Sequence, residues 1–468
     1  PVISESGFAN EPDTDATRPE NREWVRRLLA QARDERTARV ADAPIHDAAM
    51  DPEAIIDHAL AAGEAWRAQR PADRATRVRR LALGTVAARD RLVVALASES
   101  GAPAPVIDAE INGAVDAARY LGQLTAGLGA VRGAEFQPDP LALVVAEAGV
   151  PLDERAEALI AVLAAGSAVV CVAHPTVARS TAVLLDEWQA AGLPAGLVTL
   201  VTAGGESAAR FAADTRVDRA LVLGGRSTAE ALVRRRPDLR VSGRFRALGS
   251  SLIAPSTDPV AAVRAVVRSA FGAGHASPSL ARALVLLGSA ARSRRLRGQL
   301  EDAVRALRVG DTGRPGDQDP LIFDVGPLPE PVSEPGRRAL TELQPGEEWL
   351  VEPEQLDDEG RLWQPGVRIG VRRDSSFWAD AVGVPVIGVI AARTVDEAIA
   401  LQGELGCGSV AALHAGEESE IVPWLERVRA ATLVVGRATT GGRIERLPGG
   451  GLGHSGMGAQ PLASGPNR

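Results

Sequence analysis

The stretch LAAGSAVVCVAHP (163–175) is the most informative part of this chain, because its centre, SAVVCVA (167–173), is an apolar run with the length of a buried β-strand. RSTAVLLDEWQAAG (179–192) follows and predicts a helix that ends at a glycine. After Leu-Pro, LVTLV (197–201) predicts another short strand. A strand, a helix and a strand in this order form a βαβ unit, in which the two strands run in parallel.

The same alternation continues through most of the chain. Further predicted strands are RALVLGG (219–225), SLIAP (251–255), RALVLLG (282–288) and VPVIGVIAA (384–392), and further predicted helices start at Ser227 or cover 259–272 and 395–405. A loop-rich, Pro- and acid-rich stretch, 311–360, separates the last strand and helix from the others. The pattern predicts an α/β fold with a mostly parallel sheet covered by helices on both faces.

The two ends of the chain depart from this pattern. Residues 1–50 begin polar and then form a predicted helix at 21–35, and Ala-rich helical segments such as 51–69 dominate up to about residue 130. The tail, 441–468, is too rich in glycine for a helix or a central strand.

The composition excludes several classes of function. The 468 residues are 45% hydrophobic and 24% charged, which predicts two or three globular domains. A net charge of -8 gives no case for nucleic acid or an acidic membrane surface, and no apolar run reaches the roughly 20 residues of a membrane helix. The N-terminus does not resemble a secretory signal. Cys171 and Cys407 read as packed residues rather than a disulfide framework, so we predict a cytoplasmic protein.

Short motifs taken alone do not predict a metal or nucleotide site. The six histidines show neither helical pairing nor spacing with cysteines, so we predict no metal site. Gly451, Gly453 and Gly456 form a G-x-G-x-x-G pattern, but no predicted strand precedes it and no helix follows it. GAGHAS (272–277) follows a helix rather than a strand, which argues against a phosphate cradle.

His275 and Ser277 suggest a general base and a nucleophile, because they lie two residues apart. Catalytic triads assemble in space and need a third, orienting group, so closeness in sequence is weak support. A loop serine beside a solvated histidine is the simpler interpretation of this pair.

A second pattern consists of longer segments taken in chain order. They are FANEPDTD (8–15) with NREW (21–24), LAAGSAVVCVAHP (163–175), AAGLPAGLVTLV (190–201), VDRALVLGG (217–225), RSAFGAG (268–274), LDDEGRLWQPGVRIGV (356–371), VPVIGVIAARTVDEAIALQ (384–402), RATTGGRIERLPGGG (437–451) and SGPNR (464–468). Together they resemble the aldehyde dehydrogenase superfamily, in particular glutamate-semialdehyde (pyrroline-5-carboxylate) dehydrogenases and the dehydrogenase half of bifunctional proline-utilization proteins. The resemblance implies a Rossmann-like cofactor domain, an α/β catalytic domain and a β oligomerisation arm.

At each catalytic position of that family, this sequence carries a different residue. The family's cysteine nucleophile corresponds to Ser277, its glutamate base to Arg246 and its oxyanion asparagine to Gly149. A serine hydroxyl does not replace a thiolate without a placed base. Losing a nucleophile lowers a rate on the order of a million-fold, and losing an oxyanion donor lowers it about a hundred- to thousand-fold. We therefore expect a protein that has lost its dehydrogenase chemistry.

The positions that hold NAD in the family are replaced too. The lysine for the adenosine ribose corresponds to Val172, and the chain contains no lysine at all. The glutamate for the nicotinamide ribose corresponds to Ala381, with Gly383 at the phenylalanine that follows it, and Gly225 is a further cofactor position. Neither Val172 nor Ala381 offers a side-chain hydrogen bond to a ribose, so we expect no bound cofactor.

The resemblance also divides the chain into four parts. They are an N-terminal extension at 1–50, a degenerate NAD-binding domain at 51–245 with an arm at about 121–142, a degenerate catalytic domain at 246–430 and a C-terminal oligomerisation tail at 431–468. The arm and the tail imply a homo-oligomer, or a hetero-oligomer with an active aldehyde dehydrogenase or a proline dehydrogenase. The junction FANEPDTD leaves open whether the chain is a whole protein or part of a fusion.

The leading hypothesis is a catalytically inactive structural or regulatory subunit in proline and glutamate metabolism. Three alternatives stay open. The first is a serine-based hydrolase in which His275 assists Ser277, and the second is a residual NAD-dependent L-glutamate γ-semialdehyde dehydrogenase. The third is a ligand sensor in which Arg246 binds a carboxylate.

Overall fold

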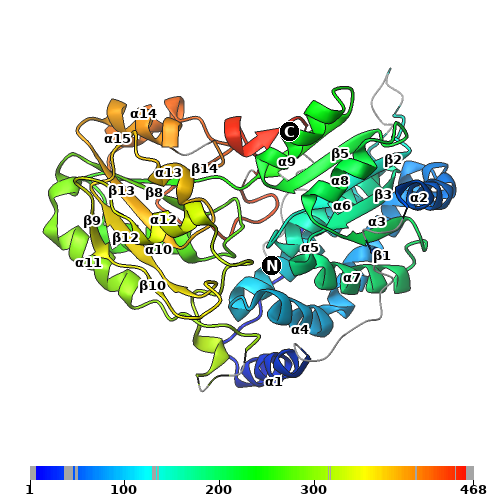
Figure 1. Cartoon of the computed structure of the whole chain (residues 1–468), viewed down its shortest axis with the longest axis horizontal. Helices are drawn as coiled ribbons and strands as arrows, with labels where there is room; N and C mark the ends of the chain where they lie inside the picture. Colours follow the sequence, from blue (N-terminus) through cyan, green and yellow to red (C-terminus); the bar gives the residue numbers. More distant parts are fainter. Residues whose placement is uncertain are drawn as a thin grey trace.

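The computed structural model describes residues 7–35, 46–47, 51–128, 133, 136–314, 316, 318–405, 408–447 and 449–459. Figure 1 shows two lobes side by side, and each lobe is built around its own seven-stranded sheet. Among these residues, no helix combines the length and apolar character needed to cross a membrane. The predicted α/β fold with parallel sheets is confirmed, with two sheets rather than one.

The first sheet has the strand order β1-β4-β3-β2-β5-β6-β16. Its strands are β1 (His46–Asp47), β4 (Val198–Thr202), β3 (Ala168–Ala173), β2 (Leu141–Ala146), β5 (Arg219–Gly224), β6 (Arg240–Phe245) and β16 (Gly456–Met457). All neighbours are parallel except β16, which runs antiparallel to β6. The chain runs outward from β2 through β3 to β4 and then returns to the other side of β2 with β5. The strand order therefore reverses between β2 and β5, where open α/β sheets bind ligands at the carboxyl ends of their strands.

Helices cover both faces of this sheet and share one core with it. They are α2 (Pro52–Arg67), α3 (Pro71–Ala87), α4 (Arg89–Ser100), α5 (Ala104–Ala126), α6 (Leu152–Ala165), α7 (Pro175–Ala190), α8 (Gly205–Ala212) and α9 (Arg226–Arg235). The local sequence sets their ends: His174 accepts the Thr176 N–H at the start of α7, and Gly166 ends α6 with a φ of 104°. Every residue of β3 is buried, as the apolar run at 167–173 predicts. Every residue of its neighbour β2, which was not predicted as a strand, is buried too.

The second sheet has the order β15-β14-β7-β8-β13-β12-β9. Its strands are β15 (Thr432–Val435), β14 (Val410–His414), β7 (Gly249–Ile253), β8 (Ala281–Leu287), β13 (Val386–Ala392), β12 (Gly366–Ile369) and β9 (Glu348–Val351). Only β9 is antiparallel to its neighbour. One face packs against α10 (Pro259–Phe271) and α11 (Arg294–Arg305). The other packs against α12 (Glu334–Thr341), α13 (Phe377–Asp380), α14 (Val395–Leu405) and α15 (Glu418–Arg427).

Helix α1 (Pro19–Glu35) contributes Leu28 and Leu29 to the same core as the helices of the first sheet. Short elements complete the fold. They are the 3₁₀ turns η1 (Gly288–Arg292), η2 (Pro320–Ile322) and η3 (Gly453–Ser455), and the small antiparallel pair β10 (Glu354–Gln355) and β11 (Trp363–Gln364). Of the glycine-rich tail, residues 441–447 and 449–459 are described, and they contain no α-helix and no central strand, as predicted. They do supply η3 and the edge strand β16.

The two ends of the predicted β arm at 121–142 belong to other elements and not to a hairpin. Residues 121–126 continue helix α5, and 141–142 are the first residues of β2. Residues 129–132 and 134–135 lie outside the described part of the chain. The predicted domain boundary at 245/246 falls between β6 and β7, which belong to different sheets. The functions assigned to these parts stay predictions.

Candidate functional site

A cavity of about 700 Å³ lies where the two lobes meet. Its walls come from α5, α6 and the end of β6 in the first lobe, and from α10, the loop after α10 and the C-terminal segment 439–450. Charged and hydroxyl groups on the walls include Glu110, Asp153, Glu154, Arg244, Arg268 and Ser277. The cavity is therefore large enough for a metabolite and carries both signs of charge.

Ser277, which we predict to occupy the family's nucleophile position, lies on the wall of this cavity. Its Oγ shares a hydrogen bond with Ser279 Oγ at 2.8 Å, and its N–H donates to the Gly274 carbonyl at 2.9 Å. None of the hydrogen bonds of the described residues joins Ser277 to a histidine or a carboxylate. The hydroxyl therefore has no base that would activate it in this arrangement.

His275 does not serve as that base, because both nitrogens of its ring are engaged elsewhere. Nε2 donates to the Gly326 carbonyl at 3.0 Å, and Nδ1 accepts from Arg282 Nη2 at 3.0 Å. Burial, together with the charge of Arg282, lowers the pKa of His275 to about 3, so the ring stays neutral. The expectation of a solvated histidine is wrong, since the residue is only 8% exposed.

The tertiary structure brings together four of the residues that we predict to replace family positions. Arg246, Ser277, Ala381 and Gly383 surround a space of about 10 Å³, although they lie far apart in the sequence. A space of this size holds about one water molecule. No nicotinamide ring fits between these residues in this conformation.

Gly149, which we predict to occupy the oxyanion position, has no room for a side chain. Its φ is 68°, and an added Cβ would lie 2.3 Å from Pro329 Cγ and 3.4 Å from the side chain of Ala276, the neighbour of Ser277. Its N–H donates to Thr176 Oγ1 at 3.3 Å. The position thus lies next to the nucleophile position, but the backbone around it accommodates only glycine.

Val172 and Cys171 are core residues of β3. Val172 is fully buried and pairs in register with Val145 and Val201 on the neighbouring strands, so it presents no polar group to a ribose. Burial raises the pKa of the Cys171 thiol to about 12, which confirms that this cysteine is a packed residue. Cys407 lies outside the described residues.

Glu147 is the residue that the sequence analysis missed. It directly follows β2, and its Oε2 accepts the Gly225 N–H at 2.6 Å and faces Arg246 Nη2 at 3.3 Å. Its other oxygen accepts a hydrogen bond from the Thr228 hydroxyl. Gly225 is the N-cap of α9, so a carboxylate of the chain itself occupies the start of this helix. The available signal was an acidic residue at the end of a buried strand, in VVAEAG.

The wall formed by α5 and α6 is acidic. Burial, and then the neighbouring Asp153, raises the pKa of Glu110 to about 7. Burial also raises the pKa values of Asp153 and Glu154, and Arg244 opposes this effect. Arg244 Nε lies 4.0 Å from Glu154, too far for a hydrogen bond. This wall therefore carries more carboxyl groups than cations.

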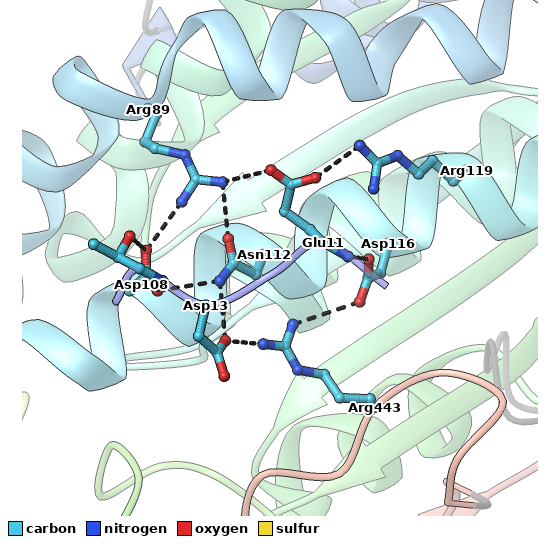
Figure 2. A network of polar contacts seen from close by, with 9 residues as sticks. Glu11, Asp13, Arg89, Asp108, Asn112, Asp116, Arg119 and Arg443 are labelled. Carbon is cyan, nitrogen blue, oxygen red and sulfur yellow. Dashed lines mark hydrogen bonds and ion pairs between the residues drawn. The ribbon is translucent and has the colours of Figure 1, made fainter. Parts of the chain in front are cut away.

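Residues 8–15, which we call the N-terminal strap, lie at the rim of the cavity and contribute Asp13 and Thr14 to its lining. Figure 2 shows Glu11 of the strap between Arg89 and Arg119, at 3.1 and 2.7 Å. Arg443, from the C-terminal segment, reaches Asp13 of the strap and Asp116 of α5. The strap thus joins α4 and α5 to the C-terminal segment at the edge of the cavity.

Metal ligation finds no support in the part of the chain that the structure describes. No cluster of three or more His, Cys, Asp or Glu side chains there has the arrangement of a metal site. The site consists of hydroxyl groups, carboxylates and arginines.

Comparisons with known proteins agree with this fold. The profile of the aldehyde dehydrogenase family matches residues 28–466. The chain is 26% identical over 417 residues to an alpha-ketoglutarate semialdehyde dehydrogenase of Haloferax volcanii, covering 85% of this chain and 84% of that protein. It is 25% identical over 429 residues to an N-succinylglutamate 5-semialdehyde dehydrogenase of Chromohalobacter salexigens, covering 86% and 84%.

Solved structures include close neighbours in shape. Proline utilization A from Corynebacterium freiburgense superposes with a TM-score of 0.86 at 28% identity, covering 96% of this chain and 45% of that one. This chain therefore spans about half the length of that protein. A 1-pyrroline-5-carboxylate dehydrogenase from Thermus with bound NAD has a TM-score of 0.83 at 19% identity, covering 96% and 95%.

The expectation of no bound cofactor is wrong for this fold, since the Thermus structure contains NAD and the family profile covers nearly all of this chain. The predicted loss of the ribose contacts at Val172 and Ala381 led to that expectation, but these are only two of the contacts that a dinucleotide makes with a cleft. The residues do not fit NAD in the conformation seen here. Glu147 accepts the Gly225 N–H, and the space between Arg246, Ser277 and Ala381 holds about one water molecule.

Proposed function

Because the chain belongs to the aldehyde dehydrogenase family, we propose that it is a member that no longer oxidises aldehydes and acts as a structural or regulatory subunit. The relatives named above are an alpha-ketoglutarate semialdehyde dehydrogenase and an N-succinylglutamate 5-semialdehyde dehydrogenase. The structural neighbours are a proline utilization A protein and a 1-pyrroline-5-carboxylate dehydrogenase. We therefore place its role near the metabolism of proline, glutamate and related semialdehydes. NAD is the nucleotide that we assign to its cleft.

One observation carries the proposal: among the described residues, Ser279 is the one side-chain hydrogen-bond partner of the Ser277 hydroxyl, and the nearby His275 ring is engaged by Gly326 and Arg282. Aldehyde oxidation needs a nucleophile that attacks the carbonyl carbon and forms a covalent hemiacetal-type adduct. A serine hydroxyl without a base forms such an adduct far too slowly.

The two neighbouring positions support the same conclusion. Arg246 carries a permanent positive charge and does not accept a proton from water, so it does not act as a hydrolytic base. Gly149 has no side chain to donate a hydrogen bond to an oxyanion, and Pro329 leaves no space for one. A single Ser277→Cys substitution would therefore restore only one of three missing groups.

The first test measures NADH formation with L-glutamate γ-semialdehyde and a panel of short aldehydes, beside an active family member. We expect no rate above the blank for the wild-type chain and for Ser277→Cys. NADH formation that disappears in Ser277→Ala would contradict the proposal, because it would show that Ser277 is catalytic.

The subunit role needs a separate test. We would tag the protein in its own host, purify it gently and identify co-purifying chains by mass spectrometry. We expect an active aldehyde dehydrogenase or a proline dehydrogenase in fixed proportion, bound through the proposed surfaces at about 121–142 and 431–468. A monomer that co-purifies with nothing would remove the subunit role while leaving the loss of catalysis intact.

A further inference from the structure

Glu147, Gly225 and Arg246 meet at the point where the strand order of the first sheet reverses. Glu147 follows β2, Gly225 follows β5 and Arg246 follows β6, and these parallel strands end at the same edge of the sheet. In open α/β sheets, phosphate-bearing ligands bind at this place. The start of a helix adds unpaired N–H groups and a positive partial charge that favour an anion.

In this chain the anion at that place is Glu147. Its carboxylate accepts the Gly225 N–H at 2.6 Å and the Thr228 hydroxyl, and Arg246 lies 3.3 Å away. The side chain is 16% exposed, so water replaces few of these contacts. An added Cβ at Gly224 would meet the Glu147 carboxylate at 2.6 Å, which shows how closely the backbone surrounds it.

We propose that Glu147 is a built-in competitor for dinucleotide phosphate, so that NAD enters the cleft only when this carboxylate leaves the start of α9. A phosphate placed at Gly225 would need the same N–H that Glu147 now accepts. It would also lie beside a negative charge. Arg246 stabilises the closed arrangement as the counter-ion of Glu147. This inference does not rest on the loss of aldehyde oxidation.

The test titrates NAD and ADP-ribose into the full chain by isothermal titration calorimetry. Glu147→Gln keeps a carbonyl that can accept the Gly225 N–H but removes the charge, and Glu147→Ala removes both. The matched control is Glu230→Gln, which removes one charge from α9 at its surface pair with Arg226. We expect NAD to bind Glu147→Ala about tenfold more tightly than wild type, with Glu147→Gln between them. The affinity of Glu230→Gln should stay within about twofold of wild type.

Thermal unfolding of each variant checks that the fold is kept. If Glu147→Ala is unstable, Thr228→Val gives a second route, because it removes one donor that holds the carboxylate in place. It should also tighten NAD binding. Equal affinity of wild type and the Glu147 variants, whether strong or absent, would overturn the proposal. This outcome is independent of whether any NADH is formed.

Discussion

Arg246 illustrates how one replaced residue changes the chemistry of its neighbours. Its guanidinium pairs with Glu147, and together they form a compensated ion pair at the edge of the first sheet. An isolated arginine there would attract an anionic ligand, whereas the Arg246–Glu147 pair has no net charge and attracts anions less. The earlier idea that Arg246 binds the carboxylate of a metabolite must therefore include the displacement of Glu147.

Glu110 is a carboxyl group on the cavity wall whose contribution to stability depends on pH. Its pKa is raised from 4.5 to about 7, so the folded state holds the proton more tightly than the unfolded state does. The stability linked to Glu110 is therefore present below pH 4.5 and is lost as the pH rises through about 7. The neighbouring Asp153 adds to the shift, and Arg155 opposes it.

Replacing Glu110 by Gln should make the melting temperature less sensitive to pH, because the amide cannot ionise. We expect the wild type to lose on the order of a few degrees more than Glu110→Gln between about pH 5 and pH 8. Differential scanning calorimetry at both pH values measures this difference. Glu64→Gln, an exposed position on α2, is the control and should follow the wild type. Parallel curves for wild type and Glu110→Gln would contradict the expectation.

The N-terminal strap is the element that connects distant parts of the chain at the cavity. Phe8 packs edge-on against Tyr120, with ring centroids 5.6 Å apart, and Thr14 donates to Asp108 at 2.7 Å through both its N–H and its hydroxyl. Glu11 is only 15% exposed and joins α4 to α5. A half-buried carboxylate with two arginines is worth more than a surface pair, because water competes less for its hydrogen bonds.

Glu11→Gln should lower the free energy of unfolding by about 1–3 kcal/mol, since Arg119 loses its charged partner and Arg89 loses one of its two, keeping Asp108. Urea unfolding followed by tryptophan fluorescence measures this value. Glu20→Gln is the control, because Glu20 forms an exposed pair with Arg18 and should change stability by less than about 1 kcal/mol. A loss for Glu11→Gln as small as that of the control would show that the strap adds little stability.

At the scale of the whole molecule, the C-terminal segment and the residues that follow it, up to β16, connect the two lobes. After β15 in the second sheet, the chain returns to the first sheet, where β16 pairs with β6. On the way, Arg443 binds the strap and the Leu452 N–H donates to the Gly408 carbonyl at 3.2 Å. The cavity therefore depends on contacts between segments from both ends of the chain.

Deleting residues 451–468 should weaken the coupling of the two lobes, because β6 loses its antiparallel partner. We expect a stability loss of about 1–3 kcal/mol, and urea transitions by fluorescence and circular dichroism that no longer coincide. Deleting only 464–468 leaves η3 and β16 in place and should preserve coincident transitions. A single unchanged transition after the longer deletion would show that β16 contributes little.

The sequence alone determined the family and several of the elements. A buried strand such as 167–173 and the helix that follows it are predicted locally, from an apolar run of strand length and from the glycine or proline at their ends. Strands such as β2 and β14 were not predicted, and the assignment of Ser277, Arg246 and Gly149 to family positions stays a prediction. The contacts among those residues cannot be predicted from the sequence, because they depend on distances between segments that lie a hundred residues or more apart in the chain.

Only the tertiary structure decided those distances. In the folded chain Glu147 accepts the Gly225 N–H, and Pro329 packs against Gly149. Both ring nitrogens of His275 are hydrogen-bonded to groups other than Ser277. Burial is also a property of the assembled fold, and it is what raises the pKa of Glu110. A residue such as Glu147 reads as an ordinary acidic residue in sequence, and it becomes a competitor for an anion only where parallel strands bring its carboxylate to the start of a helix.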